Sequence, residues 1–149
     1  MGVVVCGEEL KRIFLGKNKE EVLYKLEPEV EIDFFSPLLI DIKRDLALYL
    51  AGKRIDFPSY PLKMDISPIA QKVLYEVRKI PYGEVRSYGW VAQKLKMQGY
   101  RAVGRILSIN PFPIIIPCHR VIRTDGSLGG FSSGIELKRK LLELEGISI

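Results

Sequence analysis

The chain has 149 residues, 47% of them hydrophobic, and a formal net charge of +5. This length accommodates one ordinary domain or two small ones. No apolar run reaches the roughly 18 residues of a membrane span, so we expect no membrane association. Charged residues at 8–12 interrupt the apolar start, and the sequence therefore predicts no signal peptide.

The two cysteines and the single histidine are not spaced like the ligands of a metal site. Free thiols favour a cytoplasmic location, and we expect no metal and no cofactor.

Positive charge is concentrated in the second half of the chain. Residues 1–66 contain 10 Lys and Arg against 12 Asp and Glu, whereas residues 67–149 contain 13 against 6. Between Arg86 and Arg105 there are five basic residues and no acidic one. Ordinary solvated lysines are one explanation. The local excess is also typical of a surface that binds a polyanion such as nucleic acid.

The first half is predicted to form a small sheet followed by a helix. A turn is expected over residues 16–21. Ser36-Pro37 is typical of a helix start, apolar residues follow at helical spacing, and Gly52 stands where this helix ends. Short apolar stretches predict the antiparallel strands: Val3–Cys6, Arg12–Leu15, Val22–Leu26 and Val30–Phe34.

A boundary is predicted after the first helix. Residues 53–66 contain Pro58 and Pro61 and show no clear hydrophobic period. We therefore assign an N-terminal domain to residues 1–60, a linker to 61–66 and a C-terminal domain to 67–149.

The C-terminal domain is predicted to be mostly helical. Ser67-Pro68 begins a first helix, and Pro81-Tyr82-Gly83 ends it. A second helix begins at Ser87, a break falls at Gln98-Gly99, and a third helix covers about 101–109. Many helical hairpins bind nothing, but two short helices joined by a glycine-containing turn, in a basic region, indicate a helix-turn-helix. The apolar positions expected to face inward are Ile69, Val73, Val77, Ile80, Val91, Leu95, Val103, Ile106 and Leu107. The predicted fold class is α/β of the α+β kind. It combines an N-terminal domain, made of a small antiparallel sheet and a helix, with this helical C-terminal domain.

A glycine-rich loop and a final helix complete the chain. Thr124–Ser133 is either a plain connector or a loop whose backbone approaches a ligand closely. The final helix, Ile135–Glu145, is expected to turn Leu137, Leu141 and Leu144 inward and residues 138–140 toward water. Glu145 breaks helix rules, because a carboxylate in the last turn opposes the helix dipole. Rule-breaking residues are enriched at functional sites.

The segment 114–121, Ile-Ile-Ile-Pro-Cys-His-Arg-Val, places Cys118 beside His119. Thiolate chemistry needs a sulfur, a base and a rigid pocket. On an extended chain adjacent side chains point to opposite faces, so these two meet only if the backbone turns or water bridges them. The alternative is that Cys118 is a small buried hydrophobe and His119 a satisfied core residue.

At this point the chain resembles the C-terminal domain of the O6-alkylguanine-DNA alkyltransferase family. The matching strings cover residues 80–146, nearly half the chain, in order and at the family's spacing. The Pro-Cys-His-Arg-Val string is the most specific of them. The N-terminal half is similar only in outline and lacks the cysteine and histidine cluster by which some relatives hold zinc. The other matching strings are Ile80–Val85, Ser87-Tyr88, Arg101–Gly104, Asn110-Pro111, Gly129–Ser132 and Leu141–Gly146.

The resemblance implies a catalytic role for five residues. Cys118 is the expected alkyl acceptor, His119 takes its proton through a bound water, and Glu145 holds His119. Tyr88 donates a hydrogen bond to the guanine ring as negative charge develops there. Asn110 is the hinge that braces the helix-turn-helix against the active-site strand.

It also implies the residues that bind DNA and enclose the base. Arg101 enters the base stack in place of a flipped nucleotide, and Ala102 and Gly104 are small enough to let the helix press into the minor groove. Ser132 approaches the O6 atom. The carbonyl of Cys118 and the backbone near Val121 read the guanine amino group. Further expected contacts come from Ser87 and Arg105 on the DNA side and from Pro117, Leu107 and Phe131 around the pocket.

Two positions depart from the family pattern. Phe131 stands where many relatives carry tyrosine, so a hydroxyl contact to the base is missing while the aromatic wall remains. Ser133 replaces a common glycine, which changes the expected freedom of the loop.

The function implied is DNA repair by a monomeric protein that acts once. The alkyl group of O6-alkylguanine, and less readily of O4-alkylthymine, moves irreversibly from double-stranded DNA to Cys118, with the DNA itself as donor and no cofactor. Two other classes stay open. A non-catalytic lesion binder keeps the fold but replaces the cysteine, usually with tryptophan. A cysteine hydrolase needs a hydrolysable acyl intermediate and an oxyanion hole.

Overall fold

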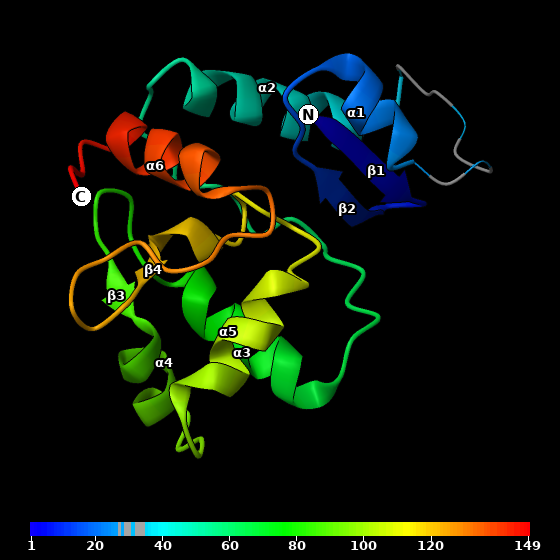
Figure 1. Ribbon diagram of the computed structural model, residues 1–149. Helices are drawn as coiled ribbons and strands as arrows, with labels where there is room; N and C mark the ends of the chain where they lie inside the picture. The colour runs from blue at the N-terminus through cyan, green and yellow to red at the C-terminus, as the bar shows by residue number, and fades with distance from the viewer. Residues whose placement is uncertain (27, 29–30, 32–34) are drawn as a thin grey trace. The chain divides into compact units, whose positions relative to one another are not determined.

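The chain divides into two compact units in a computed structural model that describes residues 1–26, 28, 31 and 35–149 (Figure 1). The first unit is Met1–Met64 and the second is Asp65–Ile149. A two-stranded antiparallel sheet lies in the first unit, and helices dominate the second. This confirms the predicted fold class.

The first unit packs two helices with a hairpin. Strands β1 (Gly2–Cys6) and β2 (Glu9–Phe14) pair antiparallel, with a bulge between Val4 and Val5. Helix α2 (Pro37–Leu50) begins as predicted, because the Ser36 side chain accepts a hydrogen bond from the Leu39 amide. The most deeply buried apolar side chains of this unit come from β2 and α2: Leu10, Ile13, Ile42, Leu46 and Tyr49.

The predicted strand Val22–Leu26 is wrong, because the helix α1 (Lys19–Tyr24) occupies this segment. The Asn18 side chain accepts a hydrogen bond from the Glu21 amide at 2.8 Å and caps the helix. Glu21 also pairs with Lys25 one turn later. The helix therefore begins inside the stretch 16–21, which was predicted to be a turn. The predicted strand Val30–Phe34 lies outside the described residues except for position 31.

The second unit places a helix-turn-helix beside two short parallel strands. Helix α3 (Pro68–Arg78) is followed by β3 (Arg86–Ser87), α4 (Tyr88–Lys94) and α5 (Tyr100–Ser108). Lys96 and Gly99, both with positive φ, make the sharp turn between α4 and α5. Strand β4 (Val121–Ile122) pairs in parallel with β3, and α6 (Ile135–Leu144) ends the unit. The strand pair was not predicted.

Two predicted helix faces are confirmed only in part. Val73 and Val77 of α3 and Leu141 of α6 are buried as predicted. In α3 the buried apolar residues are Ala70, Val73, Leu74 and Val77, whereas Ile69 is largely exposed. In α6 the buried residues are Lys138, Leu141 and Leu142, so the prediction that Lys138 faces water is wrong. Burial of this lysine depends on partners from other elements, which helical spacing alone does not reveal.

Candidate active site

Cys118 lies in a tight turn rather than on an extended strand. Pro117 precedes a single 3-10 turn, η1 (Cys118–Arg120), and the Cys118 amide donates to the Ile116 carbonyl at 2.8 Å. The turn leads directly into β4. Because the backbone turns here, the strict alternation of a strand does not apply. The Cys118 sulfur faces Asn110 and His119 faces Glu145.

The thiol is buried but has hydrogen-bond donors around it. Burial raises the pKa of Cys118, whereas the Asn110 amide, the charge of Lys138 and the backbone amides of Cys118 and His119 act to lower that pKa. The raising effect is the larger, so the group is a thiol at neutral pH. Deprotonation therefore requires a base nearby.

Asn110 links the end of α5 to the Cys118 turn. Its Nδ2 donates to the Cys118 sulfur at 3.1 Å and to the Ile116 carbonyl at 3.0 Å, while its Oδ1 accepts from the Phe112 amide at 3.0 Å. With both ends of the amide engaged, its orientation is fixed. A donor fixed in this way stabilises a thiolate more than a neutral thiol.

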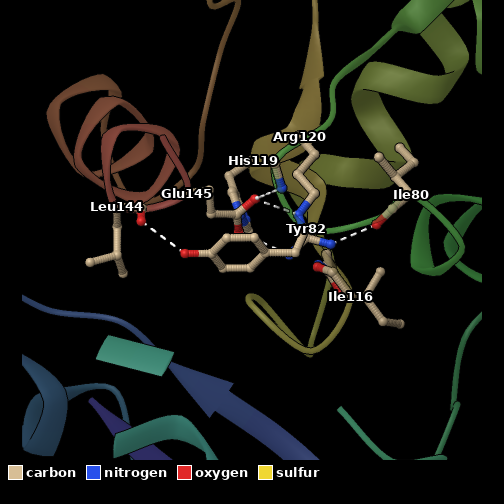
Figure 2. A network of polar contacts seen from close by, with 9 residues as sticks. Ile80, Tyr82, Ile116, His119, Arg120, Leu144 and Glu145 are labelled. Carbon is tan, nitrogen blue, oxygen red and sulfur yellow. Dashed lines mark hydrogen bonds and ion pairs between the residues drawn. The ribbon is translucent and has the colours of Figure 1, made fainter. Parts of the chain in front are cut away.

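Behind the thiol, three buried side chains form a network around one carboxylate (Figure 2). The Glu145 Oε1 lies 2.8 Å from His119 Nε2. The Glu145 Oε2 accepts from Arg120 Nε at 2.8 Å, and Oε1 also accepts from Arg120 Nη2 at 2.9 Å. The side chains of His119 and Glu145 have no exposed surface, and that of Arg120 has 7%. The prediction of a His119–Glu145 pair did not include Arg120, although a charged residue inside an apolar string was a signal for it.

The end of α6 is fixed by contacts from the segment 80–83. Glu145 is the C-terminal cap residue of α6, and its Oε2 also accepts from the Gly83 amide at 3.2 Å. The Tyr82 hydroxyl donates to the Leu144 carbonyl at 2.9 Å, and Arg120 Nη1 donates to the Ile80 carbonyl at 2.6 Å. Figure 2 shows Tyr82 beside this network. These bonds hold the carboxylate in one place.

The histidine is suited to accept a proton. Burial lowers the pKa of His119 and Glu145 acts to raise it, with burial the larger effect. The imidazole is therefore neutral at pH 7. Because Nε2 faces a carboxylate, the ring proton belongs on Nε2, and Nδ1 is the nitrogen with acceptor character.

In front of the thiol lies a cavity of about 960 Å³. This volume is at the upper end of the range for small-molecule sites. Its walls come from the start of α4, from one face of α5 and from the segments 123–125 and 129–132. The predicted site residues on its lining are Cys118, Tyr88, Arg101, Gly104, Leu107, Phe131 and Ser132.

Lys138 holds together the part of the cavity wall that contains Tyr88 and Gly130. Its fully buried Nζ donates to the carbonyls of Val121 at 2.6 Å and of Leu128, and lies 3.5 Å from the Tyr88 hydroxyl. Burial lowers the pKa of Lys138 to about 8. The Tyr88 hydroxyl also donates to the Gly130 carbonyl at 3.3 Å. This lysine ties α6, β4 and the glycine-rich loop together, and the prediction missed it because three consecutive basic residues are typical of a solvated face.

Close approach of the loop to Tyr88 requires glycine at position 129. Gly129 has φ +70°, and a Cβ there would lie 2.9 Å from the Tyr88 ring. The glycine-rich segment is therefore a positioned wall and not a plain connector. Burial raises the pKa of Tyr88, which keeps its phenol neutral.

The remaining predicted residues lie away from the cavity lining. Ser87 caps α4 by accepting from the Trp90 amide at 3.0 Å, and Pro117 is buried under the Cys118 turn. Val121 is fully buried, with its carbonyl engaged by Lys138. Ala102 is half-buried and Arg105 exposed, both on α5.

Within residues 1–26, 28, 31 and 35–149, no three His, Cys, Asp or Glu side chains lie close enough together to hold a metal ion. In the same part of the chain, no helix combines the length and hydrophobicity that a membrane crossing requires.

A buried cysteine beneath a cavity that borders a helix-turn-helix defines a DNA-binding protein with a nucleophilic thiol. Residues 68–147 match the model of the 6-O-methylguanine DNA methyltransferase DNA-binding domain. A methylated-DNA–protein-cysteine methyltransferase of Methanopyrus kandleri is 49% identical over 108 residues, which are 72% of this chain and 81% of that protein. The chain therefore belongs to the 6-O-methylguanine DNA methyltransferase family.

Solved structures agree with this assignment. The structure of Mycobacterium tuberculosis OGT in complex with DNA is 33% identical with a TM-score of 0.83, over 96% of this chain and 84% of that one. The structure of S. pombe Atl1 with damaged DNA containing O6-carboxymethylguanine is 32% identical with a TM-score of 0.51, over 57% of this chain and 82% of that one.

Proposed function

We propose that this protein repairs DNA by moving the alkyl group of O6-alkylguanine onto the sulfur of Cys118, once per molecule. The observation that carries the proposal is the placement of the Cys118 thiol. Cys118 lines the cavity and its sulfur accepts a hydrogen bond from Asn110, while the next residue in the chain is a neutral His119 that Glu145 orients. The similarity to relatives that are named methylated-DNA–protein-cysteine methyltransferases supports the same activity.

The reaction needs a base, a nucleophile and a hydrogen-bond donor for the anionic leaving group. His119 accepts the thiol proton through a water molecule, and Asn110 stabilises the thiolate that results. The S–C bond forms as the bond from carbon to O6 breaks, and the electron pair remains on the guanine. Tyr88, a neutral phenol on the cavity wall, turns its hydroxyl hydrogen from the Gly130 carbonyl to the developing guanine anion.

The product explains single turnover. A thioether does not hydrolyse under cellular conditions, and Cys6, the other cysteine in the chain, is exposed in the first unit. The alkylated protein is thus an end product, and the DNA serves as the only donor. O4-alkylthymine, which presents an alkyl group on a smaller ring, is the slower substrate.

The partner is double-stranded DNA with the damaged nucleotide everted into the cavity. Extrusion costs a few kcal/mol and leaves a gap in the stack. Arg101, exposed on α5 at the cavity, is long enough to fill the gap, and Gly104 allows α5 to approach the minor groove closely. We further propose that the protein acts as a monomer in the cytoplasm.

Intact mass spectrometry tests the proposal. Incubation with a duplex containing O6-methylguanine should add one methyl group, about 14 Da, to Cys118 at one equivalent and no more. Multiple turnover without an adduct would instead indicate the cysteine hydrolase. The Cys118→Ala variant should bind the duplex and gain no mass.

A second candidate is the non-catalytic lesion binder. It is favoured by the similarity to Atl1, whose structure holds damaged DNA. Retained binding of the lesion by the wild-type protein, with unchanged mass after long incubation, would identify this function. The cysteine at position 118, placed against hydrogen-bond donors, argues for transfer.

A further inference from the structure

Tyr100 is a large aromatic residue in an unusual place. It is the first residue of α5, directly after Gly99, whose φ of +95° sets the helix start. The residue lines the same cavity as Cys118 and Arg101. Even so, 58% of its surface is exposed, which is the highest exposure of any tyrosine in the second unit.

Exposure separates the floor of the cavity from its rim. Cys118 and Leu107, which line the floor, are 5% and 6% exposed, whereas Tyr100 is more than half exposed. A ring this exposed does not enclose a base that sits on the thiol. It borders the path by which the base enters, where the rest of the duplex remains outside.

The charge around Tyr100 suits a nucleic acid. Helix α5 carries Arg101 and Arg105 and no acidic residue. Among the described residues of the cavity lining, Arg101 and Arg123 outnumber the one acidic residue, Asp125. A flat aromatic ring can stack on a base, and the cations around it can neutralise the neighbouring phosphates. Since every base has an aromatic face, such a contact tolerates any sequence.

We propose that Tyr100 is a stacking residue for the duplex, whose ring packs against the base that flanks the everted guanine. The inference rests on the proposed repair function. By stacking, Tyr100 stabilises the base beside the gap that Arg101 fills. It thereby favours the DNA state in which the damaged nucleotide is everted. It is a positioning residue and takes no part in the transfer step.

The test compares two donors and three variants. Tyr100→Ala should slow transfer from an O6-methylguanine duplex by about tenfold, a loss within the range for one stacked base. Transfer from the free base O6-methylguanine should be unchanged, because no flanking base is present. Tyr100→Phe keeps the ring and should react with the duplex like the wild-type protein. Tyr75→Ala removes an exposed tyrosine from α3, outside the cavity lining, and is the matched control.

Three results would overturn the inference. Equal losses on duplex and free base would place Tyr100 against the everted base. A loss in Tyr100→Phe equal to that in Tyr100→Ala would assign the effect to the hydroxyl. A wild-type rate for Tyr100→Ala on the duplex would leave the ring without a role. In each case the wild-type protein still gains its methyl group, whereas failure of the wild-type protein to gain mass from either donor would sink the repair function itself.

Discussion

The polar residues behind Cys118 and those in front of it differ in how they are held. Behind the thiol, Glu145, His119 and Arg120 are buried and bonded to one another. In front, Tyr100 and Arg101 on α5 are exposed to solvent. Buried charges cost desolvation and persist only when paired, so the network behind the thiol is part of the folded structure. Under the proposed function, the residues in front gain partners when DNA binds.

This difference has a direct consequence for mutagenesis. Changes behind the thiol should affect stability and should slow transfer from every donor. Changes on the exposed face of α5 should leave stability alone and affect the duplex only.

The largest effect is expected for Glu145→Gln. Removing the carboxylate charge leaves the Arg120 guanidinium buried without its counter-charge, so the free energy of unfolding should fall by about 3–5 kcal/mol. Urea denaturation followed by the fluorescence of Trp90, the single tryptophan, measures this. Glu84→Gln is the matched control, because its ion pair with Arg86 is partly exposed and should contribute under about 1 kcal/mol. Equal losses in the two variants would mean that burial gives Glu145 no special weight.

Asn110→Ala should come next. Without its amide the thiolate loses a donor at 3.1 Å, the pKa of Cys118 rises further, and a rise of one unit means about tenfold less thiolate at neutral pH. The rate of alkylation by iodoacetamide as a function of pH measures that pKa directly. If transfer slows while the thiol pKa stays at the wild-type value, Asn110 acts only as a brace. A denaturation curve on the same sample measures that bracing.

Lys138 should produce a smaller effect with a characteristic pH dependence. Its pKa is lowered from 10.5 to about 8 in the folded protein. Between these two values the unfolded chain still binds the proton that the native lysine has released, so the free energy of unfolding rises with pH. Cys118 and Tyr88 have raised pKa values and act in the opposite direction, and Arg123 is the nearby fixed charge.

The measurement is therefore best made without the thiol. In a Cys118→Ala background, stability from pH 8 to 10 should rise less steeply once Lys138→Met is added. Lys140→Met changes an exposed lysine of the same helix and should leave the slope as it was. Identical slopes in all three proteins would show that Lys138 titrates as an ordinary surface lysine.

Lys138 also marks the limit of what the sequence could predict. The capping serines and the turn at Gly99 are local signals, and the structure places them as expected. The burial of Lys138 depends on carbonyls at 121 and 128, which no helical period encodes. Arg120 is similar, because its partner Glu145 is 25 residues away.

The misassigned strand at 22–26 has a local cause, because the Asn18 cap starts a helix before this apolar stretch. No element was predicted for the run 112–116, where the Ile116 amide donates to the Phe112 carbonyl and Ile114 adopts φ +76°. An L-residue accepts such a backbone only when its surroundings demand it, and here every residue of the run is buried. Local propensity is outweighed where packing decides.

The smallest effect is expected for Arg105→Ala on α5. Arg105 is exposed and lies outside the cavity lining, so its loss should leave folding and reaction with free O6-methylguanine unchanged. If it contacts a phosphate, duplex binding should weaken a few-fold, and the slope of log affinity against log salt should become shallower by about 1. Tyr100→Ala, which removes a stacking contact and no charge, should weaken binding with the slope unchanged. If the slope of log affinity against log salt is unchanged in Arg105→Ala, the phosphate contacts must come from other basic residues of the second unit.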